Sequence, residues 1–388
     1  MDGGEVELTV VMPCLNEADT IESCIHKAKE GLAAAGVDGE ILIADNGSTD
    51  GSQKLARDLG ARVVDVPAKG YGSALMGGIE AARGRFIIMG DADDSYDFRE
   101  IPRIHQKLIE GFDLVQGCRL PSGGGTVLPG AMPFLHRWWG NPMFSFMARR
   151  WFGAPIHDVY CGLRGFSREL YRRLDQRCTG MEFATEMIIK SSLRREKIAE
   201  VPITLHPDGR KAHAPHLKTF RDGWRTMRFF LMFSPRYLFL IPGMILILLG
   251  LIGYAIALPG FRIGGIAFDA HTLLLASLLI LCGYQTILFA LLAKTFAIAE
   301  KLVPEDPRMD RFFKIVNLER GLILGLSSMI VGVVLIGMAV MRWAHVHFGT
   351  LDYAGTMRLV VPGSTLTALG FQTIFSSFFA SILGMKRK

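Results

Sequence analysis

Four carboxylates lie close together in the stretch GDADDSYDF, residues 90–98, directly after the apolar run RFIIM. They belong to Asp91, Asp93, Asp94 and Asp97. Carboxylates this close repel one another unless a cation lies between them. Asp91 and Asp93 form a DxD pair, whose hard oxygen atoms suit a divalent cation. For such a segment taken alone, the alternative is a solvated turn in which an aspartate caps a helix.

The segments that position these residues favour a cation site over a solvated turn. Apolar runs typical of buried strands alternate with helical patterns over the first 120 residues. The predicted strands are VELTVVM, EILIAD, ARVVDV, RFIIMGD and FDLVQG. Strands separated by helices predict a doubly wound, Rossmann-like parallel sheet, in which ligands bind beyond the carboxyl ends of the strands. The polar segments PCLNE, ADNGSTDGS and GDADDSYDF all fall at that edge.

The next segments predict a longer connection and further elements of the same domain. Residues 119–135 are rich in glycine and proline and predict a loop. Residues 136–152, HRWWGNPMFSFMARRWF, predict a helix. Its aromatic and basic residues suit either a membrane-proximal surface or a buried aromatic face. HDVYCGLRGFSREL predicts a strand and a turn, and GMEFATEMIIKSSLRR predicts a helix.

Four long stretches without charged side chains follow, at 237–258, 272–293, 321–341 and 359–385. Each is long enough to cross a hydrocarbon core of roughly 30 Å as a helix. We therefore predict three parts: a catalytic domain at 1–205, an amphipathic juxtamembrane segment at 206–235, and a four-span membrane domain at 236–388.

Basic residues predict the orientation of the spans. The connection between spans two and three carries Lys294, Lys301, Arg308, Arg311, Lys314 and Arg320, and the chain ends in KRK. The other two connections hold only three arginines between them. We therefore expect a multi-pass cell-membrane protein whose N-terminal domain and C-terminus are cytoplasmic. MDGGEVELTVVMPCLNE lacks the basic start of a signal peptide.

The membrane part contains an internal repeat. GYQTILFALLA at 283–293 matches GFQTIFSSFFA at 370–380, so two related helical hairpins are expected. The paired Gln-Thr dipeptides are polar groups inside hydrocarbon, which indicates either hydrogen bonding between helices or a role in handling lipid.

The spacing of the cysteines and the net charge indicate which metals and partners the chain is expected to bind. The six cysteines form no CxxC pair and no zinc spacing, and in the cytosol they are expected to be thiols. The net charge of +6 fits a membrane surface better than a nucleic acid, given the four spans. A homo-oligomer is compatible with the sequence, which does not specify an oligomeric state.

Several motifs, in order, resemble a known family. PCLNE, ADNGSTDGS, GYGSAL and GDADDSYDF together resemble the catalytic domain of glycosyltransferase family 2, which has the GT-A fold. HDVYCGLRGF, GMEFATEM and HLKTFRDGWRTMRFFLMFSPRYLF resemble the polyprenyl-phosphate glycosyltransferases within it, the dolichol-phosphate mannose and glucose synthase group. The resemblance covers about residues 5–240 and implies an inverting hexosyltransferase that uses Mg²⁺ or Mn²⁺.

The resemblance also implies roles for particular residues. The implied donor-binding residues are Pro13, Leu15, Glu17, Asp45, Asn46, Lys69, Gly70, Asp91 and Ala92. The implied catalytic residues are Asp93, Asp158, Arg164, Glu182 and Glu186. The implied metal ligands are Asp91, Asp93 and Asp94. Some relatives have glutamine as a further ligand two residues after the DxD pair, where this chain has Ser95, so either Asp94 or Ser95 is expected to complete the metal shell. Asp158 and Arg164 are expected on the acceptor or sugar side, or as a buried salt bridge.

A lipid phosphate acceptor requires cations rather than a strong base. A phosphate monoester is already anionic near neutral pH, since its second pKa is about 6. The residues proposed to hold it are Arg210, Lys218, Arg221, Arg225 and Arg228. The last four lie on one stripe of an amphipathic helix that also carries Phe220 and Trp224, so anchoring to anionic lipid is the alternative.

The sequence therefore predicts transfer of one hexose, from UDP-glucose or GDP-mannose, to a polyprenyl phosphate on the cytoplasmic face. The alternative is a processive membrane polysaccharide synthase. Such enzymes usually carry a QxxRW motif, which this chain lacks. A non-catalytic membrane scaffold or flippase component would have no reason to keep Asp91 and Asp93 beside three nucleotide-type loops.

Overall fold

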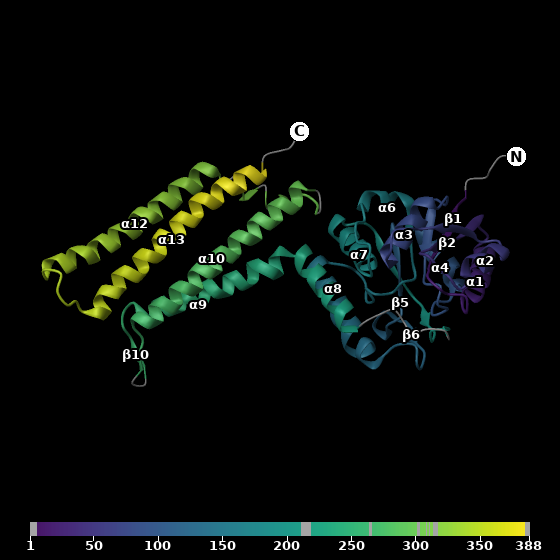
Figure 1. Cartoon of the computed structure of the whole chain (residues 1–388), viewed down its shortest axis with the longest axis horizontal. Coiled ribbons are helices and arrows are strands. Elements are labelled where there is room, and N and C mark those ends of the chain that lie inside the picture. Colours follow the sequence, from purple (N-terminus) through teal and green to yellow (C-terminus); the bar gives the residue numbers. More distant parts are fainter. Residues whose placement is uncertain are drawn as a thin grey trace. The chain divides into compact units, whose positions relative to one another are not determined.

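The computed structural model describes residues 6–210, 219–263, 266–300, 303–307, 309, 311–312 and 317–384. The chain divides into two units, Met1–Phe230 and Leu231–Lys388 (Figure 1). The division falls inside helix α8, Thr219–Phe233. The three-part division of the sequence therefore stays a prediction. Lys218 lies outside the described residues.

The first unit is built on a seven-stranded sheet with the order β3-β2-β1-β4-β7-β5-β8. The strands are β1 (Leu8–Cys14), β2 (Gly39–Asp45), β3 (Arg62–Asp65), β4 (Phe86–Met89), β5 (Leu114–Cys118), β7 (Arg164–Ser167) and β8 (Ile198–Pro202). The five strands predicted from the apolar runs are present. β7 differs from the expectation, because it runs antiparallel between β4 and β5. Side-chain alternation does not encode strand direction, so the sequence could not predict this insertion.

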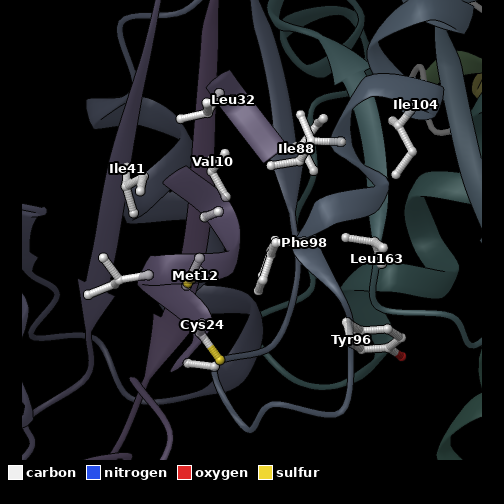
Figure 2. Close-up of a cluster of buried hydrophobic side chains, with 14 of the residues drawn as sticks. Val10, Met12, Cys24, Leu32, Ile41, Ile88, Tyr96, Phe98, Ile104 and Leu163 are labelled. Atoms are coloured by element: carbon white, nitrogen blue, oxygen red, sulfur yellow. The ribbon is translucent and has the colours of Figure 1, made fainter. Parts of the chain in front are cut away.

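Helices cover both faces of the sheet, as in a Rossmann-like GT-A domain. One face carries α1 (Ile21–Ala35), α2 (Ser52–Asp58) and α4 (Ile101–Ile109), and the other carries α3 (Tyr71–Ala81), α6 (Arg168–Leu174) and α7 (Glu182–Arg194). Figure 2 shows the core under α1 and α4, where Val10, Met12 and Ile88 of the strands meet Phe98 and Ile104. All five side chains are fully buried. Burying a side chain of this size stabilises the fold by roughly 1.5–3 kcal/mol.

The predicted helix at 136–152 is present as a continuous helical segment, η3 (His136–Gly140), α5 (Asn141–Met147) and η4 (Ala148–Phe152). A buried aromatic face is present on part of this segment, and a membrane-proximal surface stays a prediction. Phe144 and Phe152 are buried against Phe230 of α8, with ring centroids 5.8 and 5.4 Å away. Trp138 and Trp139 are exposed. The first unit therefore presents tryptophans to its surroundings beside a packed aromatic cluster.

Among its described residues, the second unit contains four helices long and apolar enough to span a membrane, which confirms the predicted spans. Their bounds are Arg236–Ala257, Ala270–Ala299, Leu318–His345 and Tyr353–Gly384. The first comprises η5 (Arg236–Leu240) and α9 (Ile241–Ala257), and the others are α10, α12 and α13. α9 packs on α10, and α12 on α13, as two hairpins that meet along α10 and α13 (Figure 1).

Glycines allow the helices within each hairpin to approach closely. A Cβ at Gly243 of α9 would lie 2.8 Å from the carbonyl oxygen of Gly283 of α10. A Cβ at Gly325 of α12 would lie 2.9 Å from that of Gly370 of α13. Gly283 and Gly370 are 87 residues apart, the offset between GYQTILFALLA and GFQTIFSSFFA. Equivalent glycines thus form equivalent contacts, which supports the predicted repeat.

Polar side chains join the two hairpins. Tyr284 of α10 and Thr373 of α13 share a hydrogen bond of 2.5 Å between their hydroxyl oxygens. Tyr254 of α9 contacts Ser277 at 2.6 Å and Thr365 at 3.1 Å in the same way. Thr373 and Thr286 belong to the two Gln-Thr dipeptides, and each donates to a carbonyl of its own helix, Leu369 and Cys282 respectively. The hydrogen bond with Tyr284 is additional for Thr373. This favours hydrogen bonding between helices as the role of Thr373.

Candidate active site

The DxD pair follows β4 at the carboxyl edge of the sheet, as the sequence predicts. Tyr71, at the start of α3, donates its hydroxyl to Asp91 Oδ1 at 2.8 Å. Burial, together with the nearby Asp93 charge, raises the pKa of Asp91 to about 7. A Cβ built at Gly162 would lie 2.7 Å from Asp91 Oδ2. The glycine therefore keeps space open beside the second oxygen of Asp91.

Asp93 is oriented through one of its oxygens. Its Oδ1 accepts hydrogen bonds from the Ser95 backbone N–H at 3.1 Å and from the Ser95 hydroxyl at 2.6 Å. Asp94 adopts a left-handed backbone conformation, with φ of 64°. Its carboxylate accepts from Lys27 Nζ of α1 at 2.7 Å and from Ser23 at 3.0 Å. The structure therefore directs Asp94 to α1, while Ser95 supports Asp93.

Two carboxylates are a sufficient protein ligand set for Mg²⁺, which usually takes its other ligands from water and substrate phosphates. Among the residues that the structure describes, no three histidine, cysteine, aspartate or glutamate side chains are grouped to hold a metal by themselves. The space beside Asp91 Oδ2 and the hard oxygens of Asp91 and Asp93 fit a cation shared with a diphosphate. The three-aspartate set is not formed, because Asp94 is paired with Lys27.

Arg210 brings a cation to this edge from a distant part of the sequence. Its Nε donates to Glu17 Oε2 at 2.8 Å, and its Nη2 donates to Asp93 Oδ2 at 3.2 Å. Its Nη1 donates to Asp208 at 3.2 Å. We expected Arg210 at the acceptor phosphate, whereas the structure places it among the carboxylates of the first and third polar loops.

The first two polar loops are joined to each other. The Glu17 backbone N–H donates to Ser52 Oγ, and the Asn16 N–H donates to Ser48 Oγ, both at 2.9 Å. Pro13 and Leu15, two further predicted donor contacts, are partly exposed on this stretch. Ala92 is different, since its side chain is buried and its carbonyl accepts from Thr20 at 2.6 Å. Ala92 therefore supports the loop through its backbone.

Asp45 ends β2 with one oxygen engaged. Its Oδ2 accepts from the backbone N–H groups of Gly47 and Ser48 at 2.9 and 3.0 Å, and from Gln53 Nε2 at 2.6 Å. Burial raises the pKa of Asp45, but these hydrogen bonds outweigh it and hold the pKa below its usual value. Its Oδ1 is buried and accepts no hydrogen bond from the described residues. An N–H or hydroxyl group of a bound ligand would satisfy this oxygen.

Asn46 shapes the loop before α3. Its Nδ2 donates to the carbonyls of Val66 and Ala68 at 2.9 and 2.7 Å, and its Oδ1 accepts from the Gly70 N–H at 2.9 Å. Lys69 Nζ donates to the Asn46 carbonyl at 2.6 Å. Gly70, with φ of 128°, lies against the carbonyl of Thr179, where a Cβ would clash. Lys69 and Gly70 therefore lie next to Asn46.

Glu186 builds the segment on which Gly70 rests. It is almost fully buried in α7, pairs with Lys190 at 2.7 Å, and accepts from the backbone N–H of Cys178 at 2.8 Å. The Thr179 carbonyl next to that amide accepts from the Ser73 N–H of α3 at 3.1 Å. The Glu186 carboxylate is thus engaged by Lys190 and by a backbone amide of the segment that precedes α7.

Asp158 is fully buried, and its partner is Arg119 rather than Arg164. Arg119 Nε and Nη2 donate to the two Asp158 oxygens at 2.7 and 2.9 Å, and the Arg119 backbone N–H adds a third bond at 3.0 Å. The expected alternative of a salt bridge between Asp158 and Arg164 is therefore not what the structure contains. Arg119 directly follows β5. This position at the sheet edge is the feature of the sequence that marks Arg119 as a candidate site residue.

Arg164 is also fully buried. Its two terminal nitrogens donate to the carbonyls of Ala184 and Cys161, both at 2.6 Å. Burial lowers the pKa of Arg164. These contacts join β7 to the start of α7, close to Glu182.

The juxtamembrane arginines belong to α8. Arg221 and Arg228 are exposed, and Arg225 is partly exposed with its Nε 3.9 Å from Glu182 Oε1. Phe220 and Trp224 of the same helix are exposed by 84% and 63%. Glu182 and Arg225 are thus brought together, although 43 residues separate them in the chain.

Comparisons with known proteins identify the family of this chain. The profile of glycosyltransferase family 2 matches residues 9–175, and that of the family 2 C-terminal transmembrane region matches residues 291–384. The low-salt glycan biosynthesis hexosyltransferase Agl6 of Haloferax volcanii is 37% identical over 97% of this chain and 89% of its own length.

The chain belongs to glycosyltransferase family 2. This family 2 enzyme is also 33% identical to a dolichyl-phosphate hexose transferase of Haloferax volcanii, over 56% of this chain and 89% of that protein. A crystal structure of glucosyl-3-phosphoglycerate synthase from Mycobacterium tuberculosis with Mn²⁺, UDP and glucosyl-3-phosphoglycerate is similar at 25% identity. The alignment covers 59% of this chain and 78% of that one, with a TM-score of 0.44. The family 2 domain and the C-terminal transmembrane region, with its membrane-spanning helices, make the protein a multi-pass membrane glycosyltransferase.

Proposed function

We propose that this glycosyltransferase transfers one hexose from a nucleotide sugar to a polyprenyl phosphate at the cytoplasmic membrane face, with inversion and with Mg²⁺ or Mn²⁺. The observation that carries the proposal is the sheet edge itself. Glu17, Asp45, Asp91 and Asp93 come from three different loops that follow strands at the carboxyl edge, where doubly wound sheets bind their ligands. The names of the Agl6 and dolichyl-phosphate relatives support the sugar and acceptor classes.

Each part of the donor has candidate partners at this edge. The free Oδ1 of Asp45 suits the nucleoside, with Pro13, Leu15, Asn46, Lys69 and Gly70 around it. Asp91 and Asp93 would hold the divalent cation beside the diphosphate. That cation would neutralise the charge of the leaving diphosphate.

The chain's residues then have to position the acceptor rather than activate it. One oxygen of the lipid phosphate attacks the anomeric carbon, the bond from that carbon to the diphosphate oxygen breaks, and the nucleoside diphosphate leaves with the electron pair. A single displacement inverts the configuration. Since the phosphate is already anionic, orienting it supplies most of what the reaction needs. Arg221, Arg225 and Arg228 of α8 are the proposed cations.

The partners of the remaining predicted residues support distinct roles. Glu182 is partly exposed and pairs with Arg225, so it is proposed to face the sugar or the acceptor. Asp158, Arg164 and Glu186 are proposed as positioning residues, because Asp158 pairs with Arg119, Glu186 pairs with Lys190, and the two terminal nitrogens of Arg164 donate to backbone carbonyls. Exposed Trp138, Trp139, Phe220 and Trp224 suit the interface of a bilayer, where aromatic rings concentrate.

The decisive experiment offers membranes containing the full chain a panel of labelled nucleotide sugars, including UDP-glucose and GDP-mannose. The expected result is label in an extractable, phosphate-linked prenol carrying one sugar. From an α-linked donor, NMR of the product should show a β linkage. Membranes with Asp91→Asn and Asp93→Asn together serve as the control. Label in a long polysaccharide would instead favour a processive synthase, and a retained α linkage would exclude the single displacement.

A further inference from the structure

Among the described residues, Arg210 makes three ion pairs at the DxD edge, with side chains from three parts of the chain. Its guanidinium contacts Glu17 at 2.8 Å, Asp93 at 3.2 Å and Asp208 at 3.2 Å. The Arg210, Glu17 and Asp93 side chains are only 12%, 6% and 15% exposed. Attraction between charges is stronger in such a partly desolvated site than at a free surface. The Arg210 guanidinium therefore offsets part of the negative charge that the carboxylates bring to this edge.

The contact with Asp93 involves the oxygen that a metal would need. Asp93 Oδ1 is already engaged by the Ser95 N–H and hydroxyl, so Oδ2 is the oxygen directed away from its own turn. Arg210 Nη2 donates to that Oδ2. A divalent cation bound to Asp93 Oδ2 and an arginine nitrogen bound to the same atom would place like charges in direct contact.

We propose that Arg210 is a resident counter-ion of the DxD site, which a divalent cation must displace before it binds Asp93. The inference rests on the metal site of the proposed function and adds a linked step to it. Glu17 and Asp208 hold the guanidinium in the absence of the metal. The metal's affinity for the substrate-free enzyme is consequently reduced by the free energy of the contact that it breaks.

The competition between Arg210 and the metal predicts how a substitution of Arg210 changes the affinity for the metal. Removing a positive group near a cation site removes repulsion and competition together, so Arg210→Gln should bind the metal more tightly than the wild type. A hydrogen bond between charged groups is worth enough to predict a decrease in the dissociation constant of roughly tenfold. Arg99→Gln is a matched control, because Arg99 pairs with Asp97 in the same acidic stretch and not with Asp93.

The experiment measures Mn²⁺ binding to the purified full chain in detergent, without nucleotide, from the electron paramagnetic resonance signal of free Mn²⁺. The expected dissociation constants are about tenfold lower for Arg210→Gln and unchanged for Arg99→Gln. Arg210→Lys, which keeps the charge should glutamine disturb the cluster, is expected between wild type and Arg210→Gln. Asp93→Asn should lose the binding.

The outcomes separate the two proposals. Mn²⁺ bound by the wild type and equally or less tightly by Arg210→Gln would overturn the counter-ion role alone. Unchanged binding by Asp93→Asn would overturn it as well, because the metal would then lie elsewhere. Binding by none of the proteins would overturn it together with the metal part of the proposed function. If the affinities follow the expected order but the protein transfers no hexose to a prenyl phosphate, the counter-ion role stands and the proposed transfer is refuted.

Discussion

At the scale of single residues, a neighbour holds one oxygen of each aspartate of the DxD pair, Tyr71 for Asp91 and Ser95 for Asp93, while Arg210 contacts the other oxygen of Asp93. Such support fixes a ligand's orientation before the metal arrives. Asparagine at 93 keeps an oxygen for Ser95 but loses the charge. We predict that Asp93→Asn lowers the transfer rate by roughly a hundredfold or more, because the cation stabilises the leaving diphosphate by several kcal/mol.

The rate of label transfer to lipid at saturating Mn²⁺ checks this prediction, and excess EDTA should abolish transfer by the wild type. Asp97→Asn is the control, since the Asp97 carboxylate accepts from Arg99 and caps a short helix. Full wild-type activity in EDTA would remove the metal from the reaction.

The pair of Arg119 and Asp158 makes a second prediction at this scale. Lysine cannot reproduce the two parallel bonds of the guanidinium. Arg119→Lys would leave the fully buried Asp158 poorly paired, and disrupting a buried pair costs about 3–5 kcal/mol. Thermal unfolding in detergent should show a clear decrease in the unfolding temperature. Arg103→Lys, at the exposed pair with Glu100, should change it little. Equal effects of the two substitutions would contradict the role given to Arg119.

At the scale of elements, α8 combines a buried anchor with exposed cations. Phe230 is fully buried against Phe144 and Phe152, so Arg225 is held near Glu182 rather than on a loose segment. We predict that Arg225→Ala raises the KM for the lipid acceptor roughly ten- to a hundredfold, the value of a hydrogen bond to a charged phosphate. The KM for the donor should stay constant. Arg172→Ala, at an exposed position on α6, is the control. A change in the donor KM alone would show that α8 does not hold the phosphate.

The membrane hairpins give a prediction about packing between elements. Gly325 of α12 faces the backbone of α13, whereas a Cβ at Gly337 of the same helix would meet nothing within 4 Å. Valine at 325 would push the helices apart, and overpacking of this kind costs about 1–3 kcal/mol. Thermal unfolding in detergent should therefore separate Gly325→Val, which is destabilised, from Gly337→Val, which is close to wild type. Equal stability would mean that α12 and α13 do not pack through Gly325.

At the scale of the whole molecule, the four spans and the basic residues predict which segments face the cytosol. In a background with Cys178 and Cys282 replaced by serine, a cysteine placed within 342–358 should react with a membrane-impermeant thiol reagent in intact cells. A cysteine within 300–315 should react only after the membrane is permeabilised. The reverse pattern would place the catalytic unit outside the cell and remove it from the cytosolic pool of nucleotide sugars.

The sequence by itself determined the features that depend on local pattern. Alternation of apolar runs with helical segments predicts the strands and helices of the sheet, because burial on one face imposes a period on the chain. Placement of the DxD pair and the Asp45 turn after strands predicts the active edge. The length of the apolar stretches determines the four spans, since the thickness of the bilayer sets a minimum helix length.

Only the tertiary structure decided which charged groups meet. Arg210 reaches Asp93 across 117 residues, Asp158 pairs with Arg119 instead of Arg164, and Asp94 pairs with Lys27. β7 enters the sheet antiparallel, which brings Arg164 and Gly162 beside the DxD loop. These outcomes depend on contacts between segments distant in the chain. A charge attracts any nearby opposite charge without regard to sequence order, so its partner is chosen by the packing that brings the two groups within reach.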